Sequence, residues 1–294
     1  MSTSRGWRER WRPTTPAWPI RHSRRPSLRT APTTRLDVKV PAGWITPDWP
    51  APVNVRSICT TRAGGISHPP YGTLNLGDHV GDAPEAVTTN RKILAGVIQA
   101  RPVFLRQVHG RSAVVLDSGA PDGAQADGCV ATAPGVACTM MVADCLPVLF
   151  CTADGGVVAA AHAGWRGLAG EGGQGILEAV VGLLGSTASA QPAQMLAWLG
   201  PCIGAPAFEV GSEVRAAFEA DDAGAASLFR PHAQSKWLAD LQGLARRRLH
   251  ALGIARIYGN DGGPAWCTVA NPSQFFSHRR DRVGGRFAAS IWRA

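Results

Sequence analysis

Three residues of metal-binding type lie in three short segments, each at the edge of an apolar run. His109 is in LRQVHG (105–110), Cys145 in VADCLPVLF (142–150) and His162 in AAAHAGWRG (159–167). Two imidazoles and one thiolate are three of the four ligands of a tetrahedral zinc ion, and a site with three protein ligands leaves a position open for water or substrate. The pattern therefore predicts a catalytic metal site. The alternative is packing, because a free Cys is among the most buried residue types.

Glycine or proline follows each of the three residues within two positions, which carries the chain out of regular pairing toward a rim. Short apolar runs predict strands, and Asp154-Gly155-Gly156 predicts a hairpin that brings the chain after Cys145 back beside the chain before His162. The predicted strands are residues 103–108, 112–117, 136–142, 147–153, 157–162, 195–200, 254–258 and 287–292.

Helical spacing of apolar residues predicts four helices. They are residues 85–98, 174–184, a helix from Ser212 with that residue as a candidate N-cap, and 237–252. Residues 36–294 contain no repeat and no linker, so we expect one mixed α/β domain there, with strands in antiparallel hairpins as well as crossovers.

The net charge of +9 is concentrated at the N-terminus, where residues 1–35 hold nine Arg and one Glu. The remaining 259 residues carry only +1, so their charge does not predict a nucleic-acid partner. Residues 1–35 are rich in Arg and Pro and poor in apolar residues, which predicts a disordered basic tail. A transit peptide and a start codon downstream of Met1 are alternative interpretations of this segment.

Seven cysteines are scattered through the chain without CxxC pairs. This pattern is typical of a reducing compartment, so we expect a cytoplasmic protein. No stretch approaches 18 uninterrupted apolar residues, and we therefore expect no membrane span.

A set of motifs, in order over about residues 52–292, resembles the YfiH/YlmD family. The motifs are TTRAGGIS, PYGTLNLGDHVGD, LRQVHG, ADGCV, VADCLPVLF, AAHAGWRG, LGPCIGAPAFEVG, FFSHRRD and GRFAASIW. Members of this family are often labelled laccase-domain or polyphenol oxidase proteins and are regarded as purine nucleoside phosphorylases. Two departures from the family pattern are His278 in place of a Tyr and Gly284-Gly285 in place of Thr-Gly.

The resemblance implies a single-domain α/β/β/α sandwich with mixed sheets, the YfiH-like fold, over residues 36–294. It also implies that His109, Cys145 and His162 bind Zn²⁺, with Cu²⁺ as a second candidate for the same site. The implied substrates are phosphate and the purine nucleosides adenosine, inosine and S-methyl-5′-thioadenosine, with adenosine deamination as a further activity. The resemblance leaves open the preferred nucleoside, the balance of the two activities and the oligomeric state.

Four further residues are candidates for this chemistry. A zinc-bound water with a pKa near 7 would supply the hydroxide that attacks C6 of adenosine. Phosphorolysis at C1′ needs anion-binding groups instead, and Arg62 and Arg166 are candidates because Arg matches phosphate geometry. Asn75 is a candidate contact to ribose or base, and Asp127 a candidate to accept a proton or orient a ligand. Alternatively, Asn75 and Asp127 serve turns and Arg166 pairs with a carboxylate.

Three other functions stay open at this stage. Cys145 is a candidate nucleophile of a cysteine hydrolase, with His162 or His109 as its base, for example in editing of peptidoglycan precursors. A copper-binding polyphenol oxidase would use a single copper ion at His109, Cys145 and His162. A multicopper cluster is disfavoured, because the seven His of residues 36–294 include no His-x-His pair. A non-enzymatic nucleic-acid-binding protein would depend on residues 1–35 alone.

Overall fold

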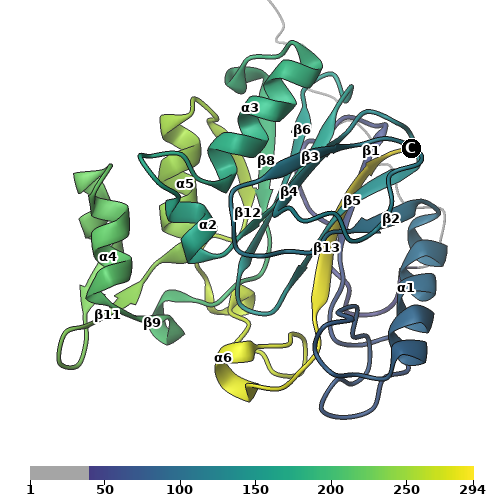
Figure 1. Cartoon of the computed structure of the whole chain (residues 1–294), viewed down its shortest axis with the longest axis horizontal. Coiled ribbons are helices and arrows are strands. Elements are labelled where there is room, and N and C mark those ends of the chain that lie inside the picture. Colours follow the sequence, from purple (N-terminus) through teal and green to yellow (C-terminus); the bar gives the residue numbers. More distant parts are fainter. Residues whose placement is uncertain (1–39) are drawn as a thin grey trace, which may run out of the picture. The chain divides into compact units, whose positions relative to one another are not determined.

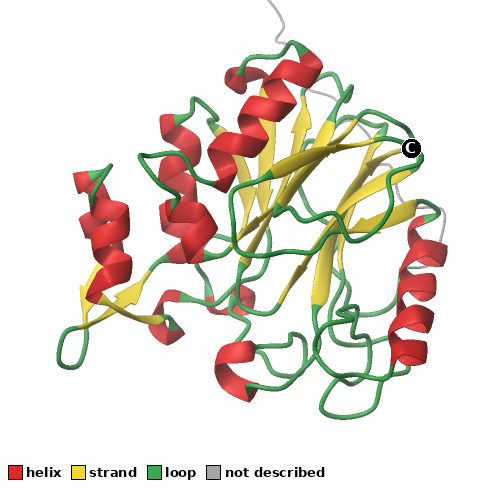
Figure 2. Cartoon of the chain, in the orientation of Figure 1, coloured by secondary structure: helices red, strands yellow, loops and turns green. Residues whose placement is uncertain are grey.

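The computed structural model describes residues 40–294, in which two β-sheets face each other and helices cover their outer faces (Figures 1 and 2). The basic tail predicted over residues 1–35 lies outside the described residues. Within the described part of the chain, no helix combines the length and the apolarity that a membrane crossing requires.

The larger sheet has six strands in the order β12-β8-β6-β7-β4-β3. They are β3 (Ala113–Leu116), β4 (Gly128–Ala131), β6 (Leu146–Thr152), β7 (Val158–Ala163), β8 (Met195–Leu199) and β12 (Arg256–Gly259). The inner strands pair antiparallel, whereas β3–β4 and β12–β8 pair parallel. The predicted hairpin is confirmed, since Asp154-Gly155-Gly156 joins β6 to β7 and Gly155 adopts φ of 70°, where glycine is unstrained.

The smaller sheet has four strands in the order β1-β13-β5-β2. They are β1 (Val55–Cys59), β2 (Arg101–Phe104), β5 (Val136–Val142) and β13 (Phe287–Arg293). β13 is antiparallel to both of its neighbours, and β2 is parallel to β5. Both large sheets are therefore mixed, as predicted.

Strand β5 shows why the two sheets stack. Successive side chains of a strand point to opposite faces. Cys138 and Met140 pack into the apolar cluster between the two sheets, whereas Ala137 and Met141 pack against the cluster that includes Leu94 of helix α1 (Pro84–Ile98). A strand that is buried on both faces has an almost unbroken apolar sequence, and VACTMMV therefore predicts a strand here.

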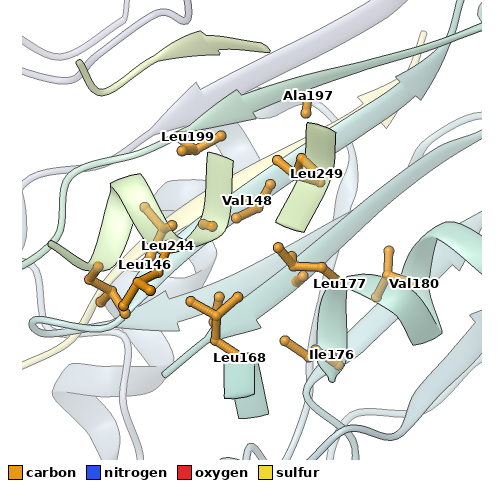
Figure 3. Close-up of a cluster of buried hydrophobic side chains, with 14 of the residues drawn as sticks. Leu146, Val148, Leu168, Ile176, Leu177, Val180, Ala197, Leu199, Leu244 and Leu249 are labelled. Atoms are coloured by element: carbon orange, nitrogen blue, oxygen red, sulfur yellow. The ribbon is translucent and has the colours of Figure 1, made fainter. Parts of the chain in front are cut away.

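The outer face of the six-stranded sheet packs against α3 (Ile176–Ala188) and α5 (Leu241–Ala251) (Figure 3). Leu146 and Val148 of β6 meet Leu177 of α3 and Leu244 of α5 in one cluster. Each such buried side chain stabilises the fold by about 1.5–3 kcal/mol. The order of layers is α/β/β/α, so the predicted fold class is confirmed.

The remaining elements are α2 (Trp165–Ala169), α4 (Ser212–Glu219), α6 (His278–Asp281) and an antiparallel sheet of β9 (Glu209–Gly211), β11 (Lys236–Ala239) and β10 (Phe229–Pro231). Leu168 of α2 packs into the same cluster as α3 and α5 (Figure 3).

The sequence-based prediction omits β1 and β4, and several of its boundaries are wrong, including the end of the helix predicted over residues 174–184, which extends to Ala188. The helix predicted over residues 237–252 begins at Leu241, because residues 236–239 form β11 and the Asp240 side chain caps the helix by accepting a hydrogen bond from Gly243 N. Ser212 is the first helical residue rather than the N-cap, which is Gly211. The strand predicted over residues 103–108 is β2, which ends at Phe104 because the chain leaves the sheet to form the loop that carries His109.

Candidate metal centre

His109, Cys145 and His162 lie together at one end of the two sheets. Cys145 directly precedes β6, and His162 is the penultimate residue of β7. Because Leu146 pairs with Ala163 in the antiparallel ladder, the two ligand residues lie on adjacent strands. His109 reaches them from the loop between β2 and β3. We call these three residues the His–Cys–His group.

The ligand atoms of the His–Cys–His group all lie within 4.8 Å of one another. Cys145 Sγ is 3.7 Å from His109 Nε2, and the two imidazole rings meet edge to face with centroids 4.8 Å apart. His162 is buried, Cys145 is partly buried and His109 is exposed. The group is therefore accessible to solvent from the His109 side.

The loop that carries His109 is held by Gln107 on the side of the four-stranded sheet. The Gln107 Nε2 group donates a hydrogen bond to Met141 O at 2.8 Å, and Oε1 accepts one from Met141 N at 2.9 Å. His109 itself adopts φ of 60°, which is uncommon for a residue with a side chain and requires support from its surroundings.

Asp127 holds the same loop from the side of the six-stranded sheet. Its carboxylate is fully buried just before β4 and accepts hydrogen bonds from Val108 N, His109 N and Gly110 N at 3.1, 2.9 and 2.7 Å. It also contacts His162 Nδ1 at 2.8 Å. Burial raises the pKa of Asp127, but its hydrogen bonds and the charge of His162 outweigh burial and lower the pKa below its usual value.

The contact with Asp127 leaves Nε2 of His162 as the nitrogen that is free for a metal ion. A carboxylate on the second ring nitrogen is the usual partner of a metal-binding His, since it fixes the tautomer and the ring orientation. Asp127 therefore has the geometry of an orienting carboxylate. Its four hydrogen-bond contacts occupy both carboxylate oxygens, which fits an orienting role better than that of a proton acceptor.

The absence of a side chain at Gly164 leaves room for the His–Cys–His group. A Cβ atom at this position would lie 2.8 Å from His109 Cδ2 and 3.1 Å from Cys145 Sγ. Any side chain here would displace two of the three candidate ligands, which explains the glycine in the HAGWRG motif.

Charge couples Cys145 to His162. Burial raises the pKa of the Cys145 thiol, but the charge of His162 and hydrogen bonds from both imidazoles outweigh burial and lower the pKa to about 6. Burial lowers the pKa of His162, while the Cys145 thiolate and Asp127 outweigh it and raise the pKa to about 9. Near neutral pH the protein therefore holds a thiolate next to an imidazolium.

The His–Cys–His group fits a zinc or copper ion. Metal–ligand distances of about 2.0–2.3 Å place the ligands of a tetrahedral ion roughly 3.5 Å apart, close to the 3.7 Å between Cys145 Sγ and His109 Nε2. Imidazole and thiolate donors suit both metals. Among residues 40–294, His109, Cys145 and His162 are the one set of side chains placed to bind a metal ion together. The described residues therefore supply one mononuclear site rather than a copper cluster.

Arg62, Asn75 and Arg166 lie outside the His–Cys–His group. The Arg62 guanidinium donates hydrogen bonds to Gly72 O and Pro272 O and lies over the Phe276 ring. Arg166 is exposed and stacks on Trp165. It has no carboxylate partner in the described part of the chain, so the ion pair considered as the alternative to phosphate binding is not found there. Its helix α2 abuts the His109 loop, because a Cβ at Gly167 would lie 2.5 Å from Gly110 O.

Asn75 is fully buried, and its amide is satisfied within the protein. The Oδ1 atom accepts hydrogen bonds from Gly77 N and Arg286 N, and Nδ2 donates to Gly77 O and Asp82 Oδ2. A contact from Asn75 to ribose or base would require one of these bonds to break. Asn75 thus joins the 75–82 loop to Arg286.

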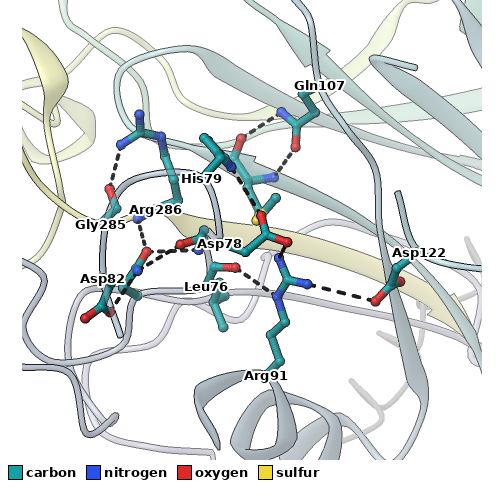
Figure 4. Close-up of polar contacts among 12 residues, drawn as sticks. Leu76, Asp78, His79, Asp82, Arg91, Gln107, Asp122, Gly285 and Arg286 are labelled. Carbon is teal, nitrogen blue, oxygen red and sulfur yellow. Dashed lines mark hydrogen bonds and ion pairs between the residues drawn. The ribbon is translucent and has the colours of Figure 1, made fainter. Parts of the chain in front are cut away.

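The 75–82 loop is also fixed by Arg91 of α1 (Figure 4). Arg91 Nε donates to Leu76 O at 3.0 Å, and Nη2 lies 3.1 Å from Asp78 Oδ2. Sequence reasoning found neither this contact nor the roles of Gln107 and Arg286, because isolated polar residues in loops carry no periodic signal.

One cavity, of about 760 Å³, is lined by none of the three residues of the His–Cys–His group. Its lining includes Glu178 of α3, Arg247 and Arg248 of α5, and Asp222. These charges pair with each other, Arg247 with Asp222 and Arg248 with Glu178. These four charged side chains are therefore neutralised within the protein and leave no unpaired charge for a ligand.

Comparison with known proteins places the chain in a family. The family described as multi-copper polyphenol oxidoreductase laccase matches residues 56–294, and the chain belongs to it. The resemblance drawn from the motifs is thereby confirmed.

Individual relatives have a more specific name. A purine nucleoside phosphorylase of Pseudomonas aeruginosa is 49% identical over 250 residues, which cover 85% of this chain and 98% of that protein. Purine nucleoside phosphorylase YfiH of Escherichia coli is 48% identical over 250 residues, covering 84% and 98%. A crystal structure from Neisseria meningitidis superposes with a TM-score of 0.77 at 45% identity, covering 85% of this chain and 99% of that one.

Proposed function

We propose that this chain is a zinc-dependent purine nucleoside phosphorylase that acts on adenosine, inosine and S-methyl-5′-thioadenosine. The observation that carries the proposal is the His–Cys–His group, whose ligand atoms lie within 4.8 Å and whose buried His162 is oriented by Asp127. The names of the two relatives that are 48–49% identical support the same activity.

Each residue of the centre has a distinct proposed role. His109, Cys145 and His162 would hold the metal, and Asp127 would keep His162 in the required tautomer. When bound, the metal would supply a Lewis acid and lower the pKa of a coordinated water toward 7. Gln107 and Asp127 together keep the His109 loop in place, so substrate would meet a preformed site.

Phosphorolysis forms a bond from a phosphate oxygen to C1′ while the bond between N9 and C1′ breaks. The purine leaves with the electron pair and takes up a proton. This reaction requires donors for the phosphate, and we propose Arg62 and Arg166 for that role, since neither pairs with a carboxylate within 4 Å in the described structure. Asn75 would position the adjacent loop rather than touch the nucleoside.

Product analysis with inosine tests this function. We expect hypoxanthine and ribose 1-phosphate to form in equal amounts, and only when phosphate is present. Arg62→Ala and Arg166→Ala should raise the KM for phosphate more than the KM for inosine. Hypoxanthine release at an unchanged rate without phosphate would indicate hydrolysis and remove the role of both arginines.

We propose adenosine deaminase activity as a second reaction of the same site. Water would replace the amino group at C6, and ammonia would leave. Incubation with adenosine in the absence of phosphate should give inosine and ammonia in equal amounts. Adenine as the sole product under any condition would contradict this activity.

One observation favours a cysteine hydrolase as the alternative. The Cys145 thiolate, with its pKa of about 6, lies beside the His162 imidazolium, an arrangement that also activates nucleophilic cysteines. The two functions differ in their need for metal, because a cysteine tightly bound to zinc is not free to attack a substrate. Activity that persists after complete chelation would favour the hydrolase.

We also propose that the protein works in the cytoplasm. All seven cysteines are free thiols, and six of them are buried. Free thiols are typical of a reducing compartment.

A further inference from the structure

Arg286 lies at the same end of the four-stranded sheet as the His–Cys–His group. It directly precedes β13, and Phe287 pairs with Val142 at the end of β5. The antiparallel register therefore places Arg286 opposite Ala143, two residues before Cys145. No prediction from the sequence involved this arginine.

The backbone and the stem of Arg286 are tightly held. Arg286 N donates to Asn75 Oδ1 at 2.9 Å, and its carbonyl accepts from Leu76 N at 3.0 Å. A Cβ at Gly77 would lie 2.8 Å from Arg286 Cγ, and one at Gly285 would lie 2.6 Å from the Phe276 ring. Gly77 thus packs closely against the stem of this side chain, while Asn75 and Leu76 hold its backbone.

The guanidinium of Arg286 is only partly used by the protein. Nη1 donates to Gly284 O and Gly285 O at 3.1 and 3.0 Å, which fixes the plane of the group. Figure 4 shows the bond to Gly285. Within the described residues, Nε and Nη2 have no hydrogen-bond partner, and no carboxylate forms an ion pair with this arginine. By contrast, the partly buried Arg91 and Arg248 each have a carboxylate partner.

The acidic groups near Arg286 are already engaged. Asp144 accepts hydrogen bonds from Thr268 Oγ1 and Arg279 N, both at 2.6 Å, so each of its oxygens has a donor. Burial lowers the pKa of Arg286, while the negative charges of Cys145 and Asp144 act to raise it. The guanidinium and the candidate metal ligand Cys145 are therefore close enough to interact electrostatically.

We infer that Arg286 is an anion-binding residue of the metal centre and that its free Nε and Nη2 donors take an oxygen pair of the phosphate co-substrate. This inference rests on the proposed phosphorylase function. A planar guanidinium presents two parallel donors that match phosphate oxygens. Zinc on a thiolate and two neutral imidazoles has a net charge of +1, so an arginine beside it makes the pocket favourable for a phosphate dianion.

Calorimetric titration of the zinc-loaded protein with inorganic phosphate tests this inference without any need for turnover. Arg286→Gln should weaken phosphate binding by about 10- to 100-fold, the usual effect of losing hydrogen bonds to a charged group. Its zinc content should match that of the unmodified protein. Arg286→Lys keeps the positive charge but not the two parallel N–H donors. Its phosphate affinity should therefore fall between those of the unmodified protein and of Arg286→Gln.

Arg246→Gln is the matched control. Arg246 is another partly buried arginine that donates to backbone carbonyls, those of Ile257, Gly259 and Asn260, but it lies on α5. This variant should bind phosphate normally. If Arg286→Gln proves unstable, Arg286→Lys is compared with Arg246→Gln instead. The phosphate affinity of Arg286→Lys should still be lower than that of Arg246→Gln.

The outcomes separate this inference from the proposed function. Phosphate affinity within twofold of the unmodified protein in zinc-loaded Arg286→Gln would overturn the inference, as would an unmodified protein that does not bind phosphate. Normal, Arg286-dependent phosphate binding without any cleavage of inosine would support the role of Arg286 and refute the phosphorylase proposal alone.

Discussion

Cys145 combines partial exposure with a lowered pKa. The other six are buried, whereas Cys145 is partly exposed and its pKa is lowered to about 6. In metal-free protein, iodoacetamide should therefore modify one thiol selectively. The rate should be nearly constant above pH 7 and should fall as pH decreases through 6, because the thiol form is unreactive.

Peptide mapping by mass spectrometry measures this rate at each pH. Prior addition of zinc should protect Cys145. A rate that still rises between pH 8 and 9 would show that the imidazoles do not lower the pKa of this thiol.

Asp127 is the residue on which both the His109 loop and His162 depend. Asp127→Asn keeps the shape but removes the charge that fixes the His162 tautomer, so zinc affinity should fall by about 10- to 100-fold. Competition with a chromophoric chelator measures the affinity. The control is Asp117→Asn, because Asp117 is an exposed loop residue that caps Gly119 N. Equal affinities in the two variants would contradict the orienting role of Asp127.

At the scale of single residues, the sequence identified the side chains that can bind a metal ion but not the residues that hold them in place. His109, Cys145 and His162 stand out because imidazole and thiol groups are rare at glycine-flanked strand ends. Gln107 and Arg286 do not stand out, since their importance comes from contacts with Met141 and Asn75, which are distant in sequence. Asn75 itself has a buried structural role that its loop motif does not reveal.

At the scale of secondary-structure elements, the strands that carry the site were predictable and the helix start at Leu241 was not. β5 and β6 are buried on both faces and therefore have continuous apolar sequences. Residues 237–239 have the spacing of a helix, but their backbone pairs with β9 and β10, and the cap at Asp240 begins the helix later. Tertiary pairing overrode a local pattern there.

The contact of α5 with α3 gives a test at this scale. Arg248 donates to Glu178 Oε1 at 3.0 Å and to Ala169 O and Gly173 O, and both charged side chains are about nine-tenths buried. Arg248→Ala leaves the Glu178 carboxylate buried without its partner, so unfolding free energy should fall by about 3–5 kcal/mol.

Urea denaturation measures this loss, and the adjacent Arg247 is the control. Arg247 pairs with Asp222 at the surface, where both side chains are more than one-third exposed. Arg247→Ala should lower the free energy of unfolding far less than Arg248→Ala, because solvent screens an exposed ion pair. Similar losses for the two variants would refute the importance of the buried pair.

At the scale of the whole molecule, residues 40–294 contain the three apolar clusters, both large sheets and the complete His–Cys–His group. The family match begins at residue 56. Deletion of residues 1–35 should therefore leave the melting temperature within about 2 °C and the activity unchanged, because this segment has too little apolar surface to contribute to a core. A large fall in melting temperature would show that the tail packs on the folded domain.

The metal content of the purified protein tests the central claim most directly. Elemental analysis should find about one zinc ion per chain, and Cys145→Ala and His109→Ala should lose metal and inosine phosphorolysis together, since a two-ligand site binds far more weakly. Chelation of the unmodified protein should abolish activity, and added zinc should restore it. Full activity in metal-free protein, with Cys145 labelled by a thiol-directed substrate analogue, would contradict the account and favour a cysteine hydrolase.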